Sequence, residues 1–268
     1  MATLVDSAAG TLKNFHAIIT GAPGHGKTFS TITLSEHCPV DFKTVVRDVP
    51  KPKQDTRINL ADNLYWTFDK GALDGFRGQG FSAPQIDSAT LPKGVDLLSE
   101  LNKGFDLVAA EVAKGRTKNL VIDTVSALNE KFEAYWKLKG EKGWDLFGAV
   151  AASHSSFAYN VRSLGCNVFF LCHLKALKDG ADMNPGELNR TRAAGLAIIV
   201  PDITGKSLNN YRKDASFILP TLREKQAGVE GRFYITAPIR GYDAKSRVEL
   251  PPIIPADWRV IKAIVAQQ

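Results

Sequence analysis

The segment Phe15–Leu34, FHAIITGAPGHGKTFSTITL, decides the fold of this chain. Its first part is an apolar run that ends at Thr20 and predicts a buried strand. The pattern G-x-x-x-x-G-K-[ST] follows directly, with every fixed position filled: Gly21, Gly26, Lys27 and Thr28. The residues from Lys27 to Ser35 then predict a helix. A strand, a glycine-rich turn and a helix in this order are typical of a P-loop, which binds the phosphates of a nucleotide.

Each fixed residue has a chemical reason for its position. Glycine lets the backbone curl so that successive N–H groups face an anion, and the start of a helix adds further N–H donors. Lys27 reaches the β- and γ-phosphates, and the Thr28 hydroxyl ligates Mg²⁺. We therefore predict ATP and Mg²⁺ as cofactors. The expected nucleotide contacts cover the turn and the residue after it: Gly21, Ala22, Pro23, Gly24, His25, Gly26, Lys27, Thr28 and Phe29. His25 fills a variable position and is expected to face solvent rather than to act in catalysis.

A second segment, KNLVIDTVSAL, supplies the carboxylate that a P-loop needs. Asn119–Ile122 predicts a buried strand with Asp123 at its C-terminal end, which is where ligands of open α/β sheets bind. Asp123 is therefore the predicted metal ligand that acts together with Thr28. The alternative role for this aspartate is to cap the helix that follows. Thr124 or Ser126 could take that cap instead.

The rest of the chain alternates between strand and helix patterns. Apolar runs bounded by turn residues predict strands at Phe15 to Thr20, Thr44 to Val49, Leu64 to Phe68, Asn119 to Asp123, Asn167 to Cys172, Ala215 to Leu219 and Arg232 to Thr236. Apolar residues at three- and four-residue steps predict helices around residues 98–112 and 150–164. This alternation indicates a single α/β domain over residues 1–268, with a mostly parallel central sheet flanked by helices. The strands after Asp214 follow one another closely and are expected to form an antiparallel edge.

Three stretches lack periodicity and are expected to be loops. Residues 71–94 form a glycine- and proline-rich excursion, residues 137–148 are short and basic, and residues 174–207 are longer and mixed. Long loops in a compact α/β domain are often functional. Residues 1–13 are interpreted as an N-terminal extension.

The composition is that of a soluble globular protein. The chain has 268 residues, of which 44% are hydrophobic and 23% charged, and its formal net charge is +6. This mild charge permits a polyanionic partner but suits an ordinary basic protein equally well. No apolar run approaches the roughly 18 residues of a membrane span, and residues 1–10 lack a secretory signal. We therefore expect a cytoplasmic protein with no membrane partner. The cysteines show neither a disulfide framework nor zinc spacing.

The order of the motifs resembles the RecA-like recombinase ATPases, and more closely the small phage and prophage members that consist of little more than the ATPase core. Some of those proteins act in single-strand annealing recombination. The resemblance rests on GAPGHGKT, LVIDTVSAL, KLKGEKGWDLFG, GCNVFFLCHLK and PDITGKSLNNYRKDASFIL in this order. It covers residues 14–48 and 117–219. It implies a RecA-like P-loop fold, ATP hydrolysis and, for a phage-encoded protein, the cytoplasm of the bacterial host.

The resemblance gives His173 a role. This residue follows the strand Asn167 to Cys172, which is expected beside Asp123 in the parallel sheet. In RecA-like proteins a polar residue at this place senses the γ-phosphate and couples it to a DNA-binding loop. The alternative is a core histidine that is held by hydrogen bonds and does not contact the nucleotide.

Two loops of the RecA-like pattern contact DNA, and they correspond here to residues 137–148 and 174–195. The first contains Lys137, Lys139, Lys142 and Trp144. The second contains Lys175, Lys178, Arg190 and Arg192. Cations neutralise phosphates, and an aromatic ring stacks on bases without sequence preference. Single-stranded DNA is therefore the expected partner, and two solvated basic loops are the alternative.

One catalytic residue departs from the family pattern. RecA-like ATPases carry a glutamate near the end of the second strand, and this glutamate polarises the attacking water. The corresponding segment here is KTVVRDVPKPKQD, in which Asp48 is the nearest carboxylate. A general base must come within hydrogen-bond reach of the water. Asp69, after the third predicted strand, is the other candidate.

The resemblance also implies a homo-oligomer, either a ring or a filament. In such assemblies a neighbouring subunit supplies a cation to the phosphates, and Lys206 in PDITGKS is the candidate. A surface lysine in a glycine-containing turn is the alternative. A single-strand-binding protein is a further expected partner.

These observations predict a Mg²⁺-dependent ATPase that acts in phage-type recombination or single-strand annealing and binds single-stranded DNA as an oligomer. The alternative is a P-loop ATPase switch that acts on a protein partner without binding DNA. A small-molecule kinase is disfavoured because the sequence shows no compact arginine-rich lid.

Overall fold

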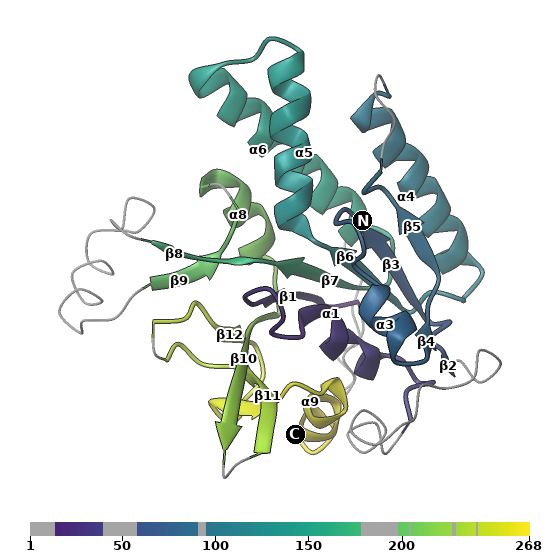
Figure 1. The fold of residues 1–268 in the computed structure, drawn as a ribbon, viewed down its shortest axis with the longest axis vertical. Helices are drawn as coiled ribbons and strands as arrows, with labels where there is room; N and C mark the ends of the chain where they lie inside the picture. Colours follow the sequence, from purple (N-terminus) through teal and green to yellow (C-terminus); the bar gives the residue numbers. More distant parts are fainter. Residues whose placement is uncertain are drawn as a thin grey trace, which may run out of the picture.

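The computed structural model describes residues 14–39, 58–90, 95–177, 198–203, 205–226, 229–239 and 241–268. A nine-stranded sheet forms its centre, in the order β13-β11-β10-β1-β7-β6-β3-β5 with β12 paired to β10 (Figure 1). The strands of this sheet are β1 (His16–Thr20), β3 (Asn63–Thr67), β5 (Gln85–Asp87), β6 (Asn119–Asp123), β7 (Asn167–Cys172), β10 (Phe217–Gln226), β11 (Val229–Ile235), β12 (Lys245–Ser246) and β13 (Ile253–Pro255). Two short pairs lie outside it: β2 (Ile58–Asn59) with β4 (Phe81–Ser82), and β8 (Leu174–Leu177) with β9 (Ile198–Pro201).

The sheet is parallel across most of its width. All neighbours from β10 through β1, β7, β6 and β3 to β5 run parallel. Antiparallel pairing joins β11 and β12 to β10, and β13 to β11. The predicted architecture, a mostly parallel sheet with antiparallel strands at its C-terminal edge, is therefore confirmed.

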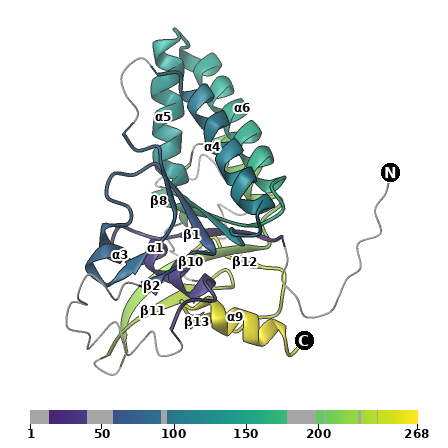
Figure 2. The same ribbon diagram turned by 90° about the vertical axis from the view of Figure 1, so that its right-hand side faces the viewer.

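Helices cover both faces of the sheet (Figure 2). One face carries α4 (Leu97–Ala113), α5 (Val125–Leu138) and α6 (Gly143–Arg162), together with α8 (Gly205–Arg212). The other face carries α1 (Lys27–Ser30), the 3-10 helix η1 (Thr31–Leu34), α3 (Asp74–Gly78) and α9 (Trp258–Val265). Successive residues of each central strand point to opposite faces of the sheet. In β7, Val168 and Phe170 pack under α4–α6, whereas Phe169 and Leu171 pack under α9. Burial on both faces explains why these strands are continuous apolar runs.

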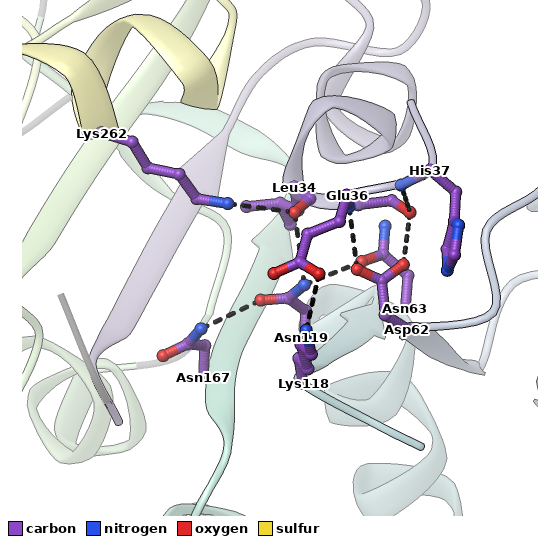
Figure 3. Close-up of polar contacts among 10 residues, drawn as sticks. Leu34, Glu36, His37, Asp62, Asn63, Lys118, Asn119, Asn167 and Lys262 are labelled. Carbon is purple, nitrogen blue, oxygen red and sulfur yellow. Dashed lines mark hydrogen bonds and ion pairs between the residues drawn. The ribbon is translucent and has the colours of Figure 1, made fainter. Parts of the chain in front are cut away.

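An asparagine ladder joins three strands at the end of the sheet opposite the P-loop (Figure 3). The side chain of Asn167 donates to Asn119 (3.0 Å), and Asn119 donates to Asn63 (2.9 Å). The three residues are in register as the first residues of β7, β6 and β3. Nearby, Asp62 accepts hydrogen bonds from the hydroxyl of Ser35 and from the backbone N–H of Glu36. These bonds satisfy buried polar groups and fix the strand register at this end.

Three segments that were expected as loops contain regular structure. Residues 71–90 hold α3, β4 and β5, and residues 91–94 lie outside the described part. Residues 137–148 form the tip of the helical hairpin α5–α6, which projects away from the sheet (Figure 1). Residues 174–207 begin as β8, return as β9 and lead into α8. Where the structure describes these segments, they are not simple loops. The short strands among them depend on pairing partners rather than on local pattern.

The glycines of the hairpin tip have a local explanation. Gly140, just beyond α5, has a φ of 95°, the left-handed conformation that commonly ends a helix. Glycine at this position therefore marks the turn between two helices rather than a long loop. The predicted strand Thr44 to Val49 lies outside the described residues. Among the described helices, none has the combination of length and apolar character needed to cross a membrane.

Candidate phosphate-binding site

The P-loop follows β1 and is held by close backbone packing. Gly24 and Gly26 have φ values of 79° and 85°, which favour glycine. Gly21 is required for a different reason, because an ideal Cβ there would lie 2.0 Å from Oγ1 of Thr221 on β10. The imidazole Nδ1 of His25 lies 3.4 Å from the carbonyl of Thr221. Strand β10 therefore supports one flank of the loop.

Lys27 lies between the P-loop and the end of β7. Its side chain is buried, and Nζ donates to the carbonyls of Gly21 (2.9 Å) and Ala22 (3.3 Å). Burial lowers the pKa of Lys27, and the neighbouring carboxylate of Asp123 opposes this effect. The ammonium group is thus placed at the loop by acceptors that a phosphate could replace.

Thr28 and Asp123 meet although they come from different parts of the chain. The Thr28 hydroxyl donates to Oδ2 of Asp123 over 2.7 Å. Asp123 ends β6, which is separated from β1 by β7. Hydroxyl and carboxylate oxygens suit Mg²⁺, whose neighbouring octahedral ligands lie about 2.9 Å apart. The pair would therefore hold the predicted metal ion through one hydroxyl and one carboxylate oxygen.

The environment of Asp123 favours a bound cation. Burial raises the pKa of Asp123 to about 6, and the like charge of Asp69 adds to this, whereas the hydrogen bond from Thr28 and the charge of Lys27 act in the opposite direction. A divalent cation would stabilise the ionised form that burial disfavours. The helix cap is provided by Thr124, whose Oγ1 accepts from the N–H of Ala127 over 3.1 Å. The carboxylate of Asp123 is therefore not needed as the cap of α5.

His173 connects the P-loop to a second carboxylate. Its Nδ1 lies 3.4 Å from Nζ of Lys27, and its Nε2 lies 3.7 Å from Oδ2 of Asp69. Since an ammonium group can only donate, Nδ1 acts as the acceptor, and a neutral ring then carries its proton on Nε2, facing Asp69. The structure thus places His173 at the phosphate end of the site and not in the core.

Asp69 lies in the site, two residues beyond β3. Strand β3 pairs with β6 so that Thr67 is opposite Asp123. Oδ2 of Asp69 accepts a hydrogen bond from the Thr124 hydroxyl over 2.8 Å. Burial raises the pKa of Asp69, but the hydrogen bond from Thr124 and the interactions with His173 and Lys27 together outweigh burial and bring the pKa below its ordinary value. Asp69 is therefore an ionised, oriented carboxylate beside Asp123.

Ser126 ties the start of α5 to the base of the β8–β9 arm. Its hydroxyl donates to the carbonyl of Asp202 (2.9 Å) and accepts from the N–H of His173 (3.0 Å). The N–H of Asp202 in turn donates to the carbonyl of His173 over 2.7 Å. A displacement of His173 would therefore be transmitted directly to both strands of the arm.

The residues predicted to contact DNA are not all described. Lys137, Lys139, Lys142 and Trp144 lie at the tip of the α5–α6 hairpin. Lys175 lies on β8, where Nζ donates to the carbonyl of Ile203 (3.3 Å). Four predicted site residues lie outside the described part of the chain: Asp48, Lys178, Arg190 and Arg192. Lys206 lies in the first turn of α8, and its side chain is also outside the described part.

Two residues lie near the P-loop although no motif in the sequence predicted them there. Thr221 of β10 packs on Gly21, and Arg232 of β11 lies against Gly26, where an ideal Cβ would be 2.6 Å from Cδ of the arginine. Both come from the C-terminal strands, far from the loop in sequence. Only the pairing of β10 with β1 brings them to the site.

Comparisons with known proteins give one family. The sequence profile of an AAA domain family matches residues 13–248. Among solved structures, a KaiC-like protein from the hyperthermophilic archaeon Pyrococcus horikoshii OT3 matches with a TM-score of 0.40 and 8% sequence identity, over 83% of this chain and 78% of that chain. No curated protein matches the sequence.

Proposed function

The chain belongs to this AAA domain family, and from this premise we propose that it is a Mg²⁺-dependent ATP hydrolase. The observation that carries the proposal is the 2.7 Å hydrogen bond between Thr28, in the first turn of α1, and Asp123, at the end of β6. Lys27, His173 and Asp69 surround the same point. A steady-state assay of phosphate release from ATP, with and without Mg²⁺, tests it directly.

In this proposal each group has a separate task. Lys27 exchanges the carbonyls of the P-loop for phosphate oxygens and neutralises charge that develops during transfer. Thr28 and Asp123 would hold the metal ion, which supplies charge stabilisation to the phosphates when bound. His173, which lies between Lys27 and Asp69, would sense whether a γ-phosphate is present.

We propose Asp69 rather than Asp48 as the carboxylate that orients the attacking water. Asp69 is ionised, it is fixed by Thr124, and it lies at the end of the strand next to Asp123. A base needs this combination of charge and position to reach a water beside the γ-phosphate. Asp48 lies outside the described residues, so the proposal rests on the placement of Asp69 alone.

Asp69→Asn is expected to lower the hydrolysis rate by about 100-fold or more, because the amide cannot accept a proton. Affinity for ATP should change little, since Asp69 is held by the hydroxyl of Thr124 and is linked to Lys27 of the P-loop through His173. Rates at saturating ATP and equilibrium binding of a non-hydrolysable analogue separate the two effects. Asp74→Asn, at an exposed carboxylate in α3, is the matched control. Near-normal turnover in Asp69→Asn would return the role to Asp48.

We further propose that the protein acts in DNA recombination and binds single-stranded DNA through the α5–α6 hairpin tip. Trp144 is 90% exposed at this tip, and Phe147 is 52% exposed. Lys139 and Lys142 flank the turn between the helices. Exposed aromatic rings beside flexible cations suit the stacked bases and phosphates of a single strand. The predicted basic residues beyond β8 belong to the same proposal.

Two substitutions at the tip should separate stacking from charge. Trp144→Ala is expected to weaken binding of single-stranded DNA about fivefold or more without altering its salt dependence. Lys139→Ala should reduce the slope of log K against log salt by roughly 0.7, because one fewer counterion-releasing contact remains. Fluorescence anisotropy of a labelled oligonucleotide across a salt series measures both. Tyr159→Ala, at another exposed aromatic of α6 away from the tip, is the control. Binding with no salt slope, or none at low ionic strength, would refute the DNA proposal.

A protein partner is the second candidate for this tip. Leu138 is 88% exposed at the end of α5, and the rings of Trp144 and Phe147 are 6.3 Å apart. Exposed apolar side chains at the tip also suit a protein contact. The protein would then be an ATPase switch that acts on a protein partner without binding DNA. A single-strand-binding protein is one partner that would fit both the DNA proposal and the protein proposal.

Assembly into a ring or filament is also part of the proposal. Lys206, at the start of α8, would then supply a cation to the phosphates of a neighbouring subunit. Electron microscopy of the protein with and without ATP and single-stranded DNA tests this. Ligand-dependent oligomers are the expected result, and a monomer under all conditions would refute it.

A further inference from the structure

Strands β10 and β11 form one side wall of the P-loop, opposite the wall that carries the catalytic groups. In the sheet order, β10 lies on one side of β1, and β7, β6 and β3 lie on the other. Asp123, His173 and Asp69 all belong to the second side. The γ-phosphate of a bound nucleotide is therefore expected towards β7 and β6, and its nucleoside towards β10 and β11.

Arg232 stands on this nucleoside side and faces the loop. Its guanidinium carbon lies 4.7 Å from the centroid of the Phe29 ring. Phe29 is the residue after Thr28, so it continues directly from the magnesium-binding end of the motif. The arginine side chain also passes so close to Gly26 that a Cβ there would lie 2.6 Å from Cδ and Nε. The guanidinium is thus held against both the loop and an aromatic ring.

A guanidinium in this position offers a flat, charged surface. Arginine stacks on aromatic planes through dispersion and cation–π attraction, and it can do so on both of its faces. The guanidinium carbon of Arg232 lies over the face of the Phe29 ring. The side chains of Arg232 and Phe29 are both only partly buried. A planar ring system can therefore be added to the pair without displacing the hydrophobic core.

We propose that Arg232 and Phe29 form a shelf on which the nucleobase of the bound nucleoside triphosphate stacks. This inference rests on the proposed nucleotide site and adds a residue that recognises the base. In this proposal Arg232 contacts the base, whereas Lys27 contacts the phosphates. The contribution of Arg232 should therefore depend on the base and not on the phosphate chain.

The test compares two ligands that differ by the whole nucleoside, because tripolyphosphate carries neither a base nor a ribose. Titration calorimetry of the full-length protein with Mg·ATP and with Mg·tripolyphosphate measures binding with and without a nucleoside. Arg232→Ala should weaken ATP binding about fivefold or more, while tripolyphosphate binding stays within about twofold of the wild-type value. Arg232→Lys keeps the charge and most of the methylene packing but loses the plane, and it should lose ATP affinity in the same way. Arg116→Ala, at an exposed arginine at the other end of the sheet, is the control.

The outcomes separate the shelf from other roles of the arginine. Equal losses for ATP and tripolyphosphate, rescued by Arg232→Lys, would assign Arg232 to the phosphates and overturn the shelf. Unchanged ATP affinity in both variants would overturn it as well. Intact tripolyphosphate binding in the variants shows that the loop is folded. If the wild-type protein binds neither ligand, the proposed nucleotide site itself fails, and the shelf fails with it.

Discussion

Lys27→Ala should abolish ATP hydrolysis, with a loss of at least about 100-fold in turnover, and should also weaken ATP binding. The ammonium group is the cation of the P-loop, and it lies beside the carbonyls of Gly21 and Ala22 and beside His173. Its removal takes away charge stabilisation at the phosphates, both in the ground state and during transfer. Phosphate release under saturating ATP and calorimetric titration of ATP measure the two effects.

The fold should survive this substitution. Burial disfavours the charged form of Lys27, so alanine removes a group that is costly to bury as well as its hydrogen bonds. Circular dichroism and thermal unfolding are expected to resemble the wild type. Lys118→Ala provides a matched control, because Lys118 is an exposed lysine that pairs with Glu36 at the opposite end of the sheet. Normal turnover in Lys27→Ala would show that the P-loop is not the hydrolytic site.

Asp123→Asn should lose Mg²⁺-dependent hydrolysis by about 100-fold or more. The amide can still accept the hydrogen bond from Thr28, but it no longer supplies a negative oxygen to the metal ion. A titration of hydrolysis against Mg²⁺ should show a strongly raised requirement or no saturation. Glu111→Gln, at a partly exposed carboxylate near the end of α4, is the control. Unchanged turnover would place the magnesium carboxylate elsewhere.

Although Asp123→Asn is expected to lower hydrolysis, it is not expected to lower the stability of the nucleotide-free protein. The pKa of Asp123 is raised from 3.8 to about 6 on folding, so the folded state disfavours the ionised carboxylate. This cost is fully present above pH about 6 and disappears as the pH falls towards 3.8. Asp123→Asn should therefore unfold at the same or a higher denaturant concentration at neutral pH, and the difference should shrink in acid. A large loss of stability at neutral pH would contradict this account of the site.

Local patterns predicted those parts of the protein that depend on nearby residues. The strand, turn and helix of residues 15–34 are encoded in one continuous segment, and β6 and β7 have the same bounds in the structure as in the prediction. The order of strand and helix patterns was enough to predict the α/β class and the antiparallel edge. A continuous apolar run predicts a central strand reliably, because such a strand is buried on both faces of the sheet.

The hairpin tip and the residues 71–90 show where local pattern failed. Glycines at 140 and 143 suggested a loop, but they form a tight turn between two long helices. The short strands β4 and β5 are stabilised by pairing with β2 and β3, which no local window of sequence contains. Asp69 was one of two candidates from the sequence, and the pairing of β3 with β6 brought it beside Asp123.

The sequence by itself determined the phosphate-binding chemistry, because a P-loop places its glycines, Lys27 and Thr28 within a single turn of chain. Only the tertiary structure decided which distant groups complete it. The strand order brings Asp123, Asp69 and His173 to one flank of the loop, and Thr221 and Arg232 to the other. The physical reason is that a parallel sheet gathers the ends of strands that are far apart in sequence, so its site depends on register and order rather than on any local pattern.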